Sequence, residues 1–216
     1  MKDDNQLQFL IRQPEEKETK NPAIFLLHGY GSDMYDLFQF SGELPKDAYV
    51  FSLQAPYDLS FGGFAWYNLN ISFDKIMYDF SQVEESAGKI REFIRIASEK
   101  YNLDQQRIVL MGFSQGAILS YSLSLKKPQL ARAVLAMSGY IPNELKQDGI
   151  NGNEVKTKYF IAHGTQDDVI PLKLAVESRD FLKKEQIDHD YNEYPMPHGI
   201  SPQALNDALN WLDKQL

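Results

Sequence analysis

The sequence predicts an α/β fold in which helices cover both faces of a mostly parallel sheet, as a three-layer sandwich. Short, continuously apolar runs recur along the chain, which is typical of strands buried on both faces. Segments with apolar residues every three or four positions lie between these runs, as expected for helices that bury one face. The 216 residues suffice for a sizeable core, so we expect a single domain over residues 1–216.

The central strands are predicted from five apolar runs. These runs cover residues 23–27, 49–53, 108–111, 133–137 and 159–162. Two more polar segments, residues 7–11 and 189–194, are expected to form strands nearer the edges of the sheet.

The first two predicted helices flank the third of these runs. Apolar residues recur at helical spacing over residues 80–101, and Ser81 with Glu84 fits a capping box at the start of this helix. A second helix should follow Ser114 and end near Lys126, whose charge suits a helix carboxyl terminus.

Two further helices are expected in the second half of the chain. One covers residues 172–184, and the last begins at Ser201, with Pro202 as its first residue. Two stretches interrupt the alternation: residues 56–78 are rich in aromatics, and residues 142–155 are polar and indicate a surface excursion. Neither is long enough for a second domain, so no large cap domain is expected.

Composition and charge exclude several classes of function. The formal net charge of −8 argues against nucleic acid and anionic membranes as main partners. The chain has no cysteine, which excludes disulfides and a cysteine nucleophile. It also lacks an HExxH motif, a GxGxxG motif and a Walker loop, so we expect no metal site and no cofactor. No run approaches the ~18 apolar residues of a membrane span, and the amino terminus lacks a signal segment, so a cytoplasmic protein is expected.

Reactive side chains follow three of the predicted strands. The sequence Gly-Phe-Ser-Gln-Gly at residues 112–116 is a G-x-S-x-G elbow that presents Ser114 directly after a strand. Asp167 and Asp168 follow another strand, and His198 follows the last one. Because ligands bind beyond the carboxyl ends of the strands in open α/β sheets, we expect these groups to lie together. The chain order of serine, aspartate and histidine is that of the α/β-hydrolase arrangement, although these residues alone leave the choice of aspartate open.

This set of residues suits acyl transfer. His198 would take the proton of Ser114 and return it to the leaving group, while a carboxylate orients the imidazole. The negative charge on the former carbonyl oxygen needs backbone N–H donors. We expect these donors from Gln115, at a helix amino terminus, and from Tyr30, in the loop after the first core strand.

Other conspicuous residues have structural interpretations. His28 and His163 are expected to be structural histidines that bond to nearby backbone. The aromatic residues of the first interrupting stretch suit either core packing or a substrate pocket, because pockets are mostly apolar. The pocket candidates are Phe61, Phe64, Trp66 and Tyr67.

The chain resembles the phospholipase/carboxylesterase family of α/β-hydrolases, which includes acyl-protein thioesterases and small bacterial carboxylesterases. The matching segments are residues 25–31, 54–56, 65–67, 107–116 and 163–171, together with His198. The resemblance implies Ser114 as nucleophile, Asp167 rather than Asp168 as the acid, and His198 as base. It also implies backbone donors at Tyr30 and Gln115.

We therefore expect a serine carboxylesterase that hydrolyses small-molecule esters, and also thioesters as an extension, through an acyl-enzyme. Tyr30 stands where the family usually has a smaller or aliphatic residue, so we expect short- to medium-chain acyl groups. The alternatives are a lysophospholipase, an acyl-protein thioesterase or a small peptidase on the same fold. A non-catalytic ligand-binding protein is the alternative of another class. The sequence is also compatible with a homodimer, because some members of the family that it resembles form one.

Overall fold

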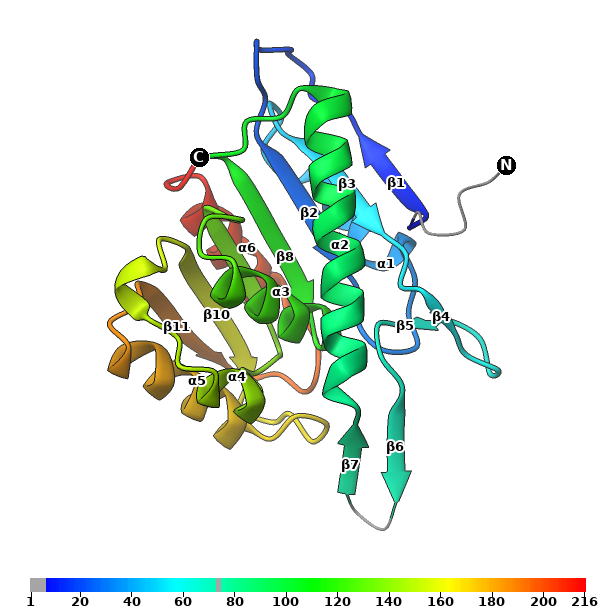
Figure 1. Cartoon of the computed structure of the whole chain (residues 1–216), viewed down its shortest axis with the longest axis vertical. Coiled ribbons are helices and arrows are strands. Elements are labelled where there is room, and N and C mark those ends of the chain that lie inside the picture. Colours follow the sequence, from blue (N-terminus) through cyan, green and yellow to red (C-terminus); the bar gives the residue numbers. More distant parts are fainter. Residues whose placement is uncertain (1–6, 73–74) are drawn as a thin grey trace.

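The computed structural model describes residues 7–72 and 75–216, with a seven-stranded sheet at its centre (Figure 1). Residues 1–6, for which the sequence predicts no signal segment, lie outside this description. The strand order is β1-β3-β2-β8-β9-β10-β11. The strands are β1 (Phe9–Arg12), β2 (Ala23–Leu27), β3 (Tyr49–Leu53), β8 (Ile108–Phe113), β9 (Ala133–Met137), β10 (Lys158–Gly164) and β11 (His189–Tyr194).

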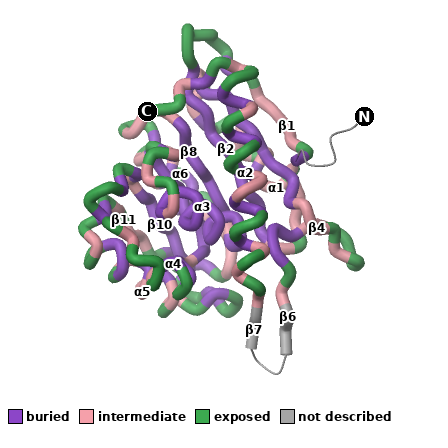
Figure 2. Tube along the Cα trace, in the orientation of Figure 1, coloured by how far each residue is buried: buried purple, intermediate pink, exposed green. Residues whose placement is uncertain are grey.

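Within this seven-stranded sheet of the described residues, neighbouring strands from β3 to β11 are parallel, and the edge strand β1 pairs antiparallel with β3. The predicted α/β fold with a mostly parallel sheet is therefore confirmed. Every residue of β2, β3 and β9 is buried, which explains their continuous apolarity (Figure 2).

Two apolar clusters lie on opposite faces of the sheet. Successive side chains of a strand alternate between faces, so Phe25 joins one cluster and Ile24 the other. Helices α2 (Phe80–Tyr101), α3 (Gln115–Lys126) and α5 (Leu172–Lys184) cover the first face. Helices α1 (Tyr35–Phe38) and α6 (Pro202–Leu212) cover the second, which gives three layers (Figure 1).

The N-cap predicted for α6 is confirmed, and the N-cap predicted for α2 is wrong. Ser201 caps α6, because its side chain accepts a hydrogen bond from Ala204 N at 3.2 Å. The capping box predicted at Ser81 is wrong: Asp79 is the N-cap of α2, and its carboxylate accepts from Ser81 N at 2.9 Å. The chain leaves the preceding strand in an extended conformation, which places Asp79 rather than Ser81 at the junction.

The two interrupting stretches differ in their packing. Within residues 56–72 and 75–78, β4 (Tyr57–Asp58) pairs antiparallel with β5 (Phe64–Ala65), and β6 (Leu69–Ser72) pairs antiparallel with β7 (Lys75–Tyr78). Residues 142–155 contain α4 (Asn143–Gln147) and the 3-10 helix η2 (Gly152–Glu154). Another 3-10 helix, η1 (Gln39–Gly42), follows α1 in the first part of the chain. The prediction of a simple surface excursion at 142–155 is wrong in part, because Leu145 of α4 is fully buried in the core.

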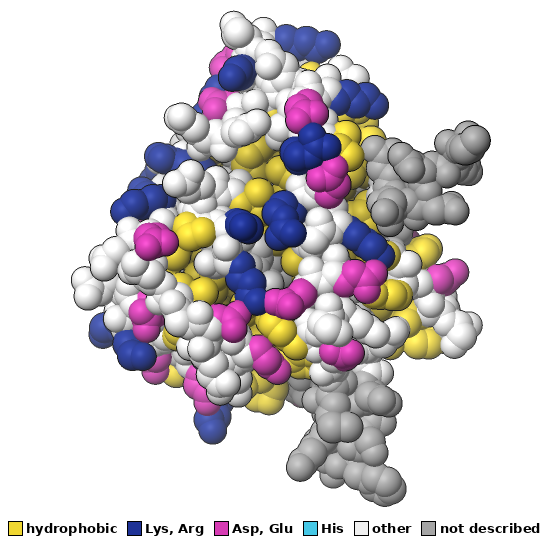
Figure 3. Space-filling view, in the orientation of Figure 1, with side chains coloured by type: hydrophobic (Ala, Val, Ile, Leu, Met, Phe, Trp, Pro, Cys, Tyr) yellow, Lys and Arg dark blue, Asp and Glu magenta, His cyan; other side chains and the backbone are white. Residues whose placement is uncertain are grey.

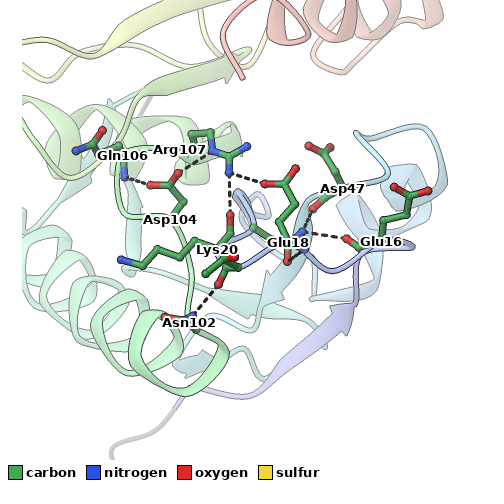
Figure 4. A network of polar contacts seen from close by, with 10 residues as sticks. Glu16, Glu18, Lys20, Asp47, Asn102, Asp104, Gln106 and Arg107 are labelled. Atoms are coloured by element: carbon green, nitrogen blue, oxygen red, sulfur yellow. Dashed lines mark hydrogen bonds and ion pairs between the residues drawn. The ribbon is translucent and has the colours of Figure 1, made fainter.

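A network of polar contacts lies at the end of the sheet where the parallel strands β2 and β8 begin (Figure 4). Arg107, just before β8, donates to Asp104 at 2.8 Å, to Glu18 at 2.9 Å and to Lys20 O at 2.8 Å. The network joins the start of β8 to the chain that enters β2. On the surface of the molecule that carries α2 and α3, basic and acidic side chains are interspersed (Figure 3). No helix in residues 7–72 and 75–216 has the length and apolar character needed to cross a bilayer.

Candidate active site

Ser114 lies in a tight turn between β8 and α3. Its φ of +53° is a conformation that non-glycine residues rarely adopt, so the fold holds this serine under backbone strain. A Cβ at Gly112 would lie 2.2 Å from Gly116 O, and a Cβ at Gly116 would lie 1.9 Å from Leu27 O. Only glycine fits at both positions, which is the physical reason for the G-x-S-x-G spacing.

The structure brings Ser114, His198 and Asp167 into one hydrogen-bonded chain. Ser114 Oγ lies 3.1 Å from His198 Nε2, and His198 Nδ1 lies 2.7 Å from Asp167 Oδ2. With Nδ1 donating to the carboxylate, Nε2 is free to accept the serine proton. Asp168 is exposed and has no part in this chain.

The Asp167 carboxylate is held from several sides and is shielded from solvent. Its Oδ1 accepts hydrogen bonds from Val169 N at 3.0 Å and Ile170 N at 2.8 Å. The ring of His163 donates from Nε2 to Ile170 O at 2.9 Å and lies 3.3 Å from Asp167 Oδ2. His163 bonds to backbone, as the sequence predicts, but its place beside the carboxylate is an additional feature.

Two residues that the sequence interpretation missed hold the loop that carries His198. Ser138 follows β9 and donates from Oγ to Gly199 O at 2.8 Å. The ring of Phe113 packs against the imidazole of His198 with 5.0 Å between ring centroids. The position of Ser138 directly after a predicted strand is the signal that could have marked it.

The two expected oxyanion donors lie on different segments: Tyr30 is in the loop after β2, and Gln115 is the first residue of α3. Among the described residues, the backbone N–H groups of Tyr30 and Gln115 have no protein acceptor in the hydrogen-bond network. The loop before Tyr30 is fixed by His28, whose Nδ1 donates to Gly29 O at 2.7 Å and whose Nε2 accepts from Ala55 N at 3.1 Å. Burial lowers the pKa of His28, so the ring is held neutral, as its acceptor role requires. The predicted structural role of His28 agrees with these contacts.

The four pocket candidates fall into two groups. Trp66 and Tyr67 are 0% and 1% exposed, and their side chains pack in the core. Phe61 is 71% exposed, and its ring lies 6.2 Å from that of Tyr30, while Phe64 is half-buried. A role in lining a pocket therefore stays a prediction for Phe61 and Phe64, and Trp66 and Tyr67 have packing roles instead.

Among the described residues, the site places a hydroxyl beside an imidazole, a carboxylate behind that imidazole, and two backbone N–H groups without a protein acceptor. In the part of the chain that the structure describes, His, Asp and Glu side chains form no group of three or more that could hold a metal ion. The groups on hand are those that acyl transfer uses.

Comparison with known proteins gives consistent matches, of which the family model, one relative and one solved structure cover nearly the whole chain. Residues 8–216 match the model of a family described as phospholipase/carboxylesterase. Acyl-protein thioesterase 1 of Saccharomyces cerevisiae is 31% identical over 160 residues, which cover 70% of this chain and 69% of that protein. Acyl-protein thioesterase 1 of Mycosarcoma maydis is 28% identical, with 96% and 97% covered. Among solved structures, esterase PE8 superposes with a TM-score of 0.85 at 25% identity, over 98% of this chain and 100% of that one.

Proposed function

The chain belongs to the phospholipase/carboxylesterase family. We propose that it is a carboxylesterase for short- to medium-chain esters, with Ser114, His198 and Asp167 as its catalytic triad. Family membership makes it a serine hydrolase that acts on ester bonds. The observation that carries the finer proposal is the contact of 3.1 Å between Ser114 Oγ and His198 Nε2, because it joins a nucleophile to its base.

Acylation follows from this geometry. Ser114 Oγ attacks the ester carbonyl while His198 Nε2 takes its proton, and Asp167 stabilises the imidazolium that forms. The carbonyl oxygen becomes an oxyanion and accepts hydrogen bonds from the N–H groups of Tyr30 and Gln115. When the intermediate collapses, the bond to the alcohol oxygen breaks and His198 returns the proton to the leaving alcohol.

Deacylation repeats these steps with water. His198 takes a proton from a water molecule that attacks the acyl-serine, and the same two backbone donors stabilise the second oxyanion. Collapse releases the carboxylic acid and returns the proton to Ser114. One set of groups thus serves both halves of the reaction.

The preference for shorter acyl groups is supported by the aromatic pair at the oxyanion loop. The ring centroids of Tyr30 and Phe61 lie 6.2 Å apart, and two bulky rings beside the donor at Tyr30 favour short acyl groups over long ones in the proposed site. A series of p-nitrophenyl esters from acetyl to palmitoyl tests the proposal. We expect kcat/KM to peak at the shorter chains, and a steady rise to palmitoyl would contradict it.

The assignment of the nucleophile has its own test. A fluorophosphonate probe should label the wild-type protein and leave Ser114→Ala unlabelled. The variant should also lose ester hydrolysis by several orders of magnitude. Full hydrolysis by Ser114→Ala would overturn the triad.

Thioester hydrolysis is the second candidate, because both fungal relatives named above are acyl-protein thioesterases. A thiolate is a good leaving group and needs no change in the triad. Measuring kcat/KM for an oxygen ester and a thioester of the same acyl group separates the two candidates. A higher value for the thioester would favour the second one.

A further inference from the structure

The buried residue Trp66 hydrogen-bonds both to the loop that carries Tyr30 and to Gln115, the first residue of α3. We propose that Trp66 is a positioning residue which fixes the N–H groups of Tyr30 and Gln115 relative to one another, a role that rests on the proposed function. The bridging segment, residues 64–67, contacts both the Tyr30 loop and the start of α3, and Trp66 bonds to both.

The loop is held on both sides of Tyr30. The indole N–H of Trp66 donates to His28 O at 2.9 Å, and the two rings lie 5.4 Å apart. After Tyr30, Gly31 N donates to Phe64 O at 2.9 Å. The bridging segment therefore fixes the backbone at His28, two residues before the donor at Tyr30, and at Gly31, directly after it.

The start of α3 is held through the side chain of its first residue, Gln115. Its Oε1 accepts from Trp66 N at 3.0 Å, and its Nε2 donates to Tyr67 O at 2.8 Å. Gln115 is only 3% exposed, so water does not compete for these bonds. Two bonds from one planar amide fix the first residue of α3, and with it the direction of the second donor.

The bridging segment is itself anchored in the core. Trp66 is fully buried, and its carbonyl accepts a hydrogen bond from the hydroxyl of Ser86 on α2. Breaking any of these buried bonds leaves an unsatisfied polar group, which is costly. The distance between the two donors is thus set by a rigid part of the fold rather than by the Tyr30 loop or the start of α3 alone.

Positioning of the two donors by Trp66 should stabilise the transition state rather than the bound substrate. The ester oxygen carries little charge before attack, so a displaced donor weakens ground-state binding only slightly. The oxyanion needs both donors at hydrogen-bond distance at once, so the same displacement raises the barrier. A loss of kcat at constant KM is the signature to expect.

The two tryptophans of the chain provide a matched pair of variants. Trp66→Phe removes the indole N–H and keeps an aromatic ring. Trp211→Phe makes the same change on α6, where the indole donates to the Asp190 carboxylate outside the site. We expect Trp66→Phe to lower kcat about 10- to 100-fold with KM unchanged, and to weaken a boronic acid transition-state analogue in parallel. Trp211→Phe should keep the wild-type kcat and the wild-type affinity for the analogue.

Other outcomes decide against the proposal. Wild-type kcat and analogue affinity in Trp66→Phe would overturn it, as would a loss confined to the melting temperature. Should that variant not fold, Gln115→Met removes the two side-chain bonds and keeps the backbone donor. It must then show the same loss of kcat and analogue affinity, and wild-type values would overturn the proposal. Ester hydrolysis by Ser114→Ala would instead remove the proposed function, so the two failures are distinguishable.

Discussion

His163 Nε2 lies 3.3 Å from Asp167 Oδ2, the same carboxylate oxygen that His198 contacts at 2.7 Å, and both the His163 and Asp167 side chains are closed to solvent. Two imidazole rings thus lie against one oxygen of this carboxylate. One imidazole reaches the serine, and the other bonds to Ile170 O at 2.9 Å and so holds the loop that follows Asp167. The second imidazole stabilises the conformation in which the carboxylate meets His198.

Replacement of His163 should therefore affect both stability and rate. His163→Leu removes the bond to Ile170 O, and an unsatisfied buried group costs about 1–3 kcal/mol of unfolding free energy. We expect kcat to fall as well, because the Asp167 loop loses its support. His163→Gln places an amide N–H near the same acceptor and should recover part of both losses. Urea unfolding and ester kinetics measure the two effects, and wild-type values for His163→Leu would contradict the interpretation.

The two adjacent aspartates should respond differently to amide substitution. Asp167→Asn can no longer stabilise the imidazolium of His198, so kcat should fall by about 10³- to 10⁴-fold. Asp168→Asn changes an exposed side chain outside the hydrogen-bonded chain and should stay close to wild type. Both kcat values with one p-nitrophenyl ester provide the test. The reverse result would move the acid to Asp168.

Local pattern predicted the parts of the fold that depend on neighbours in sequence. The expected helices at residues 80–101 and 172–184 match α2 and α5, because each buries a stripe that recurs along one helix face. The cap of α2 was not predictable in this way. Asp79 and Ser81 both suit an N-cap, and the direction in which the chain leaves β7 decides between them.

The residues that support the site were harder to predict for the same reason. Ser138 hydrogen-bonds to Gly199, and Trp66 hydrogen-bonds to His28 and Gln115, and each pair is far apart in the sequence. No periodicity encodes such contacts, because they exist only when the strands are assembled. The reactive groups could be predicted because each of them closely follows a strand that is recognisable in the sequence. The carboxyl ends of parallel strands lie at the same end of the sheet, where ligands bind.

Phe61 should influence the choice of acyl chain without supporting the fold. Its ring is 71% exposed, so Phe61→Ala should change the unfolding free energy by less than about 0.5 kcal/mol. Removal of the ring beside Tyr30 should raise kcat/KM for long-chain esters relative to short ones. Tyr35→Ala removes another exposed aromatic ring, which is 62% exposed, and serves as the control. An unchanged chain-length profile in Phe61→Ala would exclude Phe61 from the substrate path.

The buried ring of His28 should make the fold sensitive to acid. Burial lowers its pKa in the folded protein, whereas in the unfolded chain the pKa is about 6.5. Between these two values the unfolded chain binds the proton and the folded protein does not. The unfolding free energy contributed by this group is therefore fully present above about pH 6.5 and declines as the pH falls toward the lowered folded pKa.

Urea unfolding between about pH 7.5 and pH 5 measures this decline. His28→Gln removes the titrating ring, so its unfolding free energy should be lower at neutral pH but should fall less steeply with acid than that of the wild type. Because His28 fixes the loop that leads to Tyr30, the variant should also lose kcat at neutral pH. Equal acid slopes in the two proteins would mean that protonation of His28 does not limit stability. The acid sensitivity would then have to come from other groups.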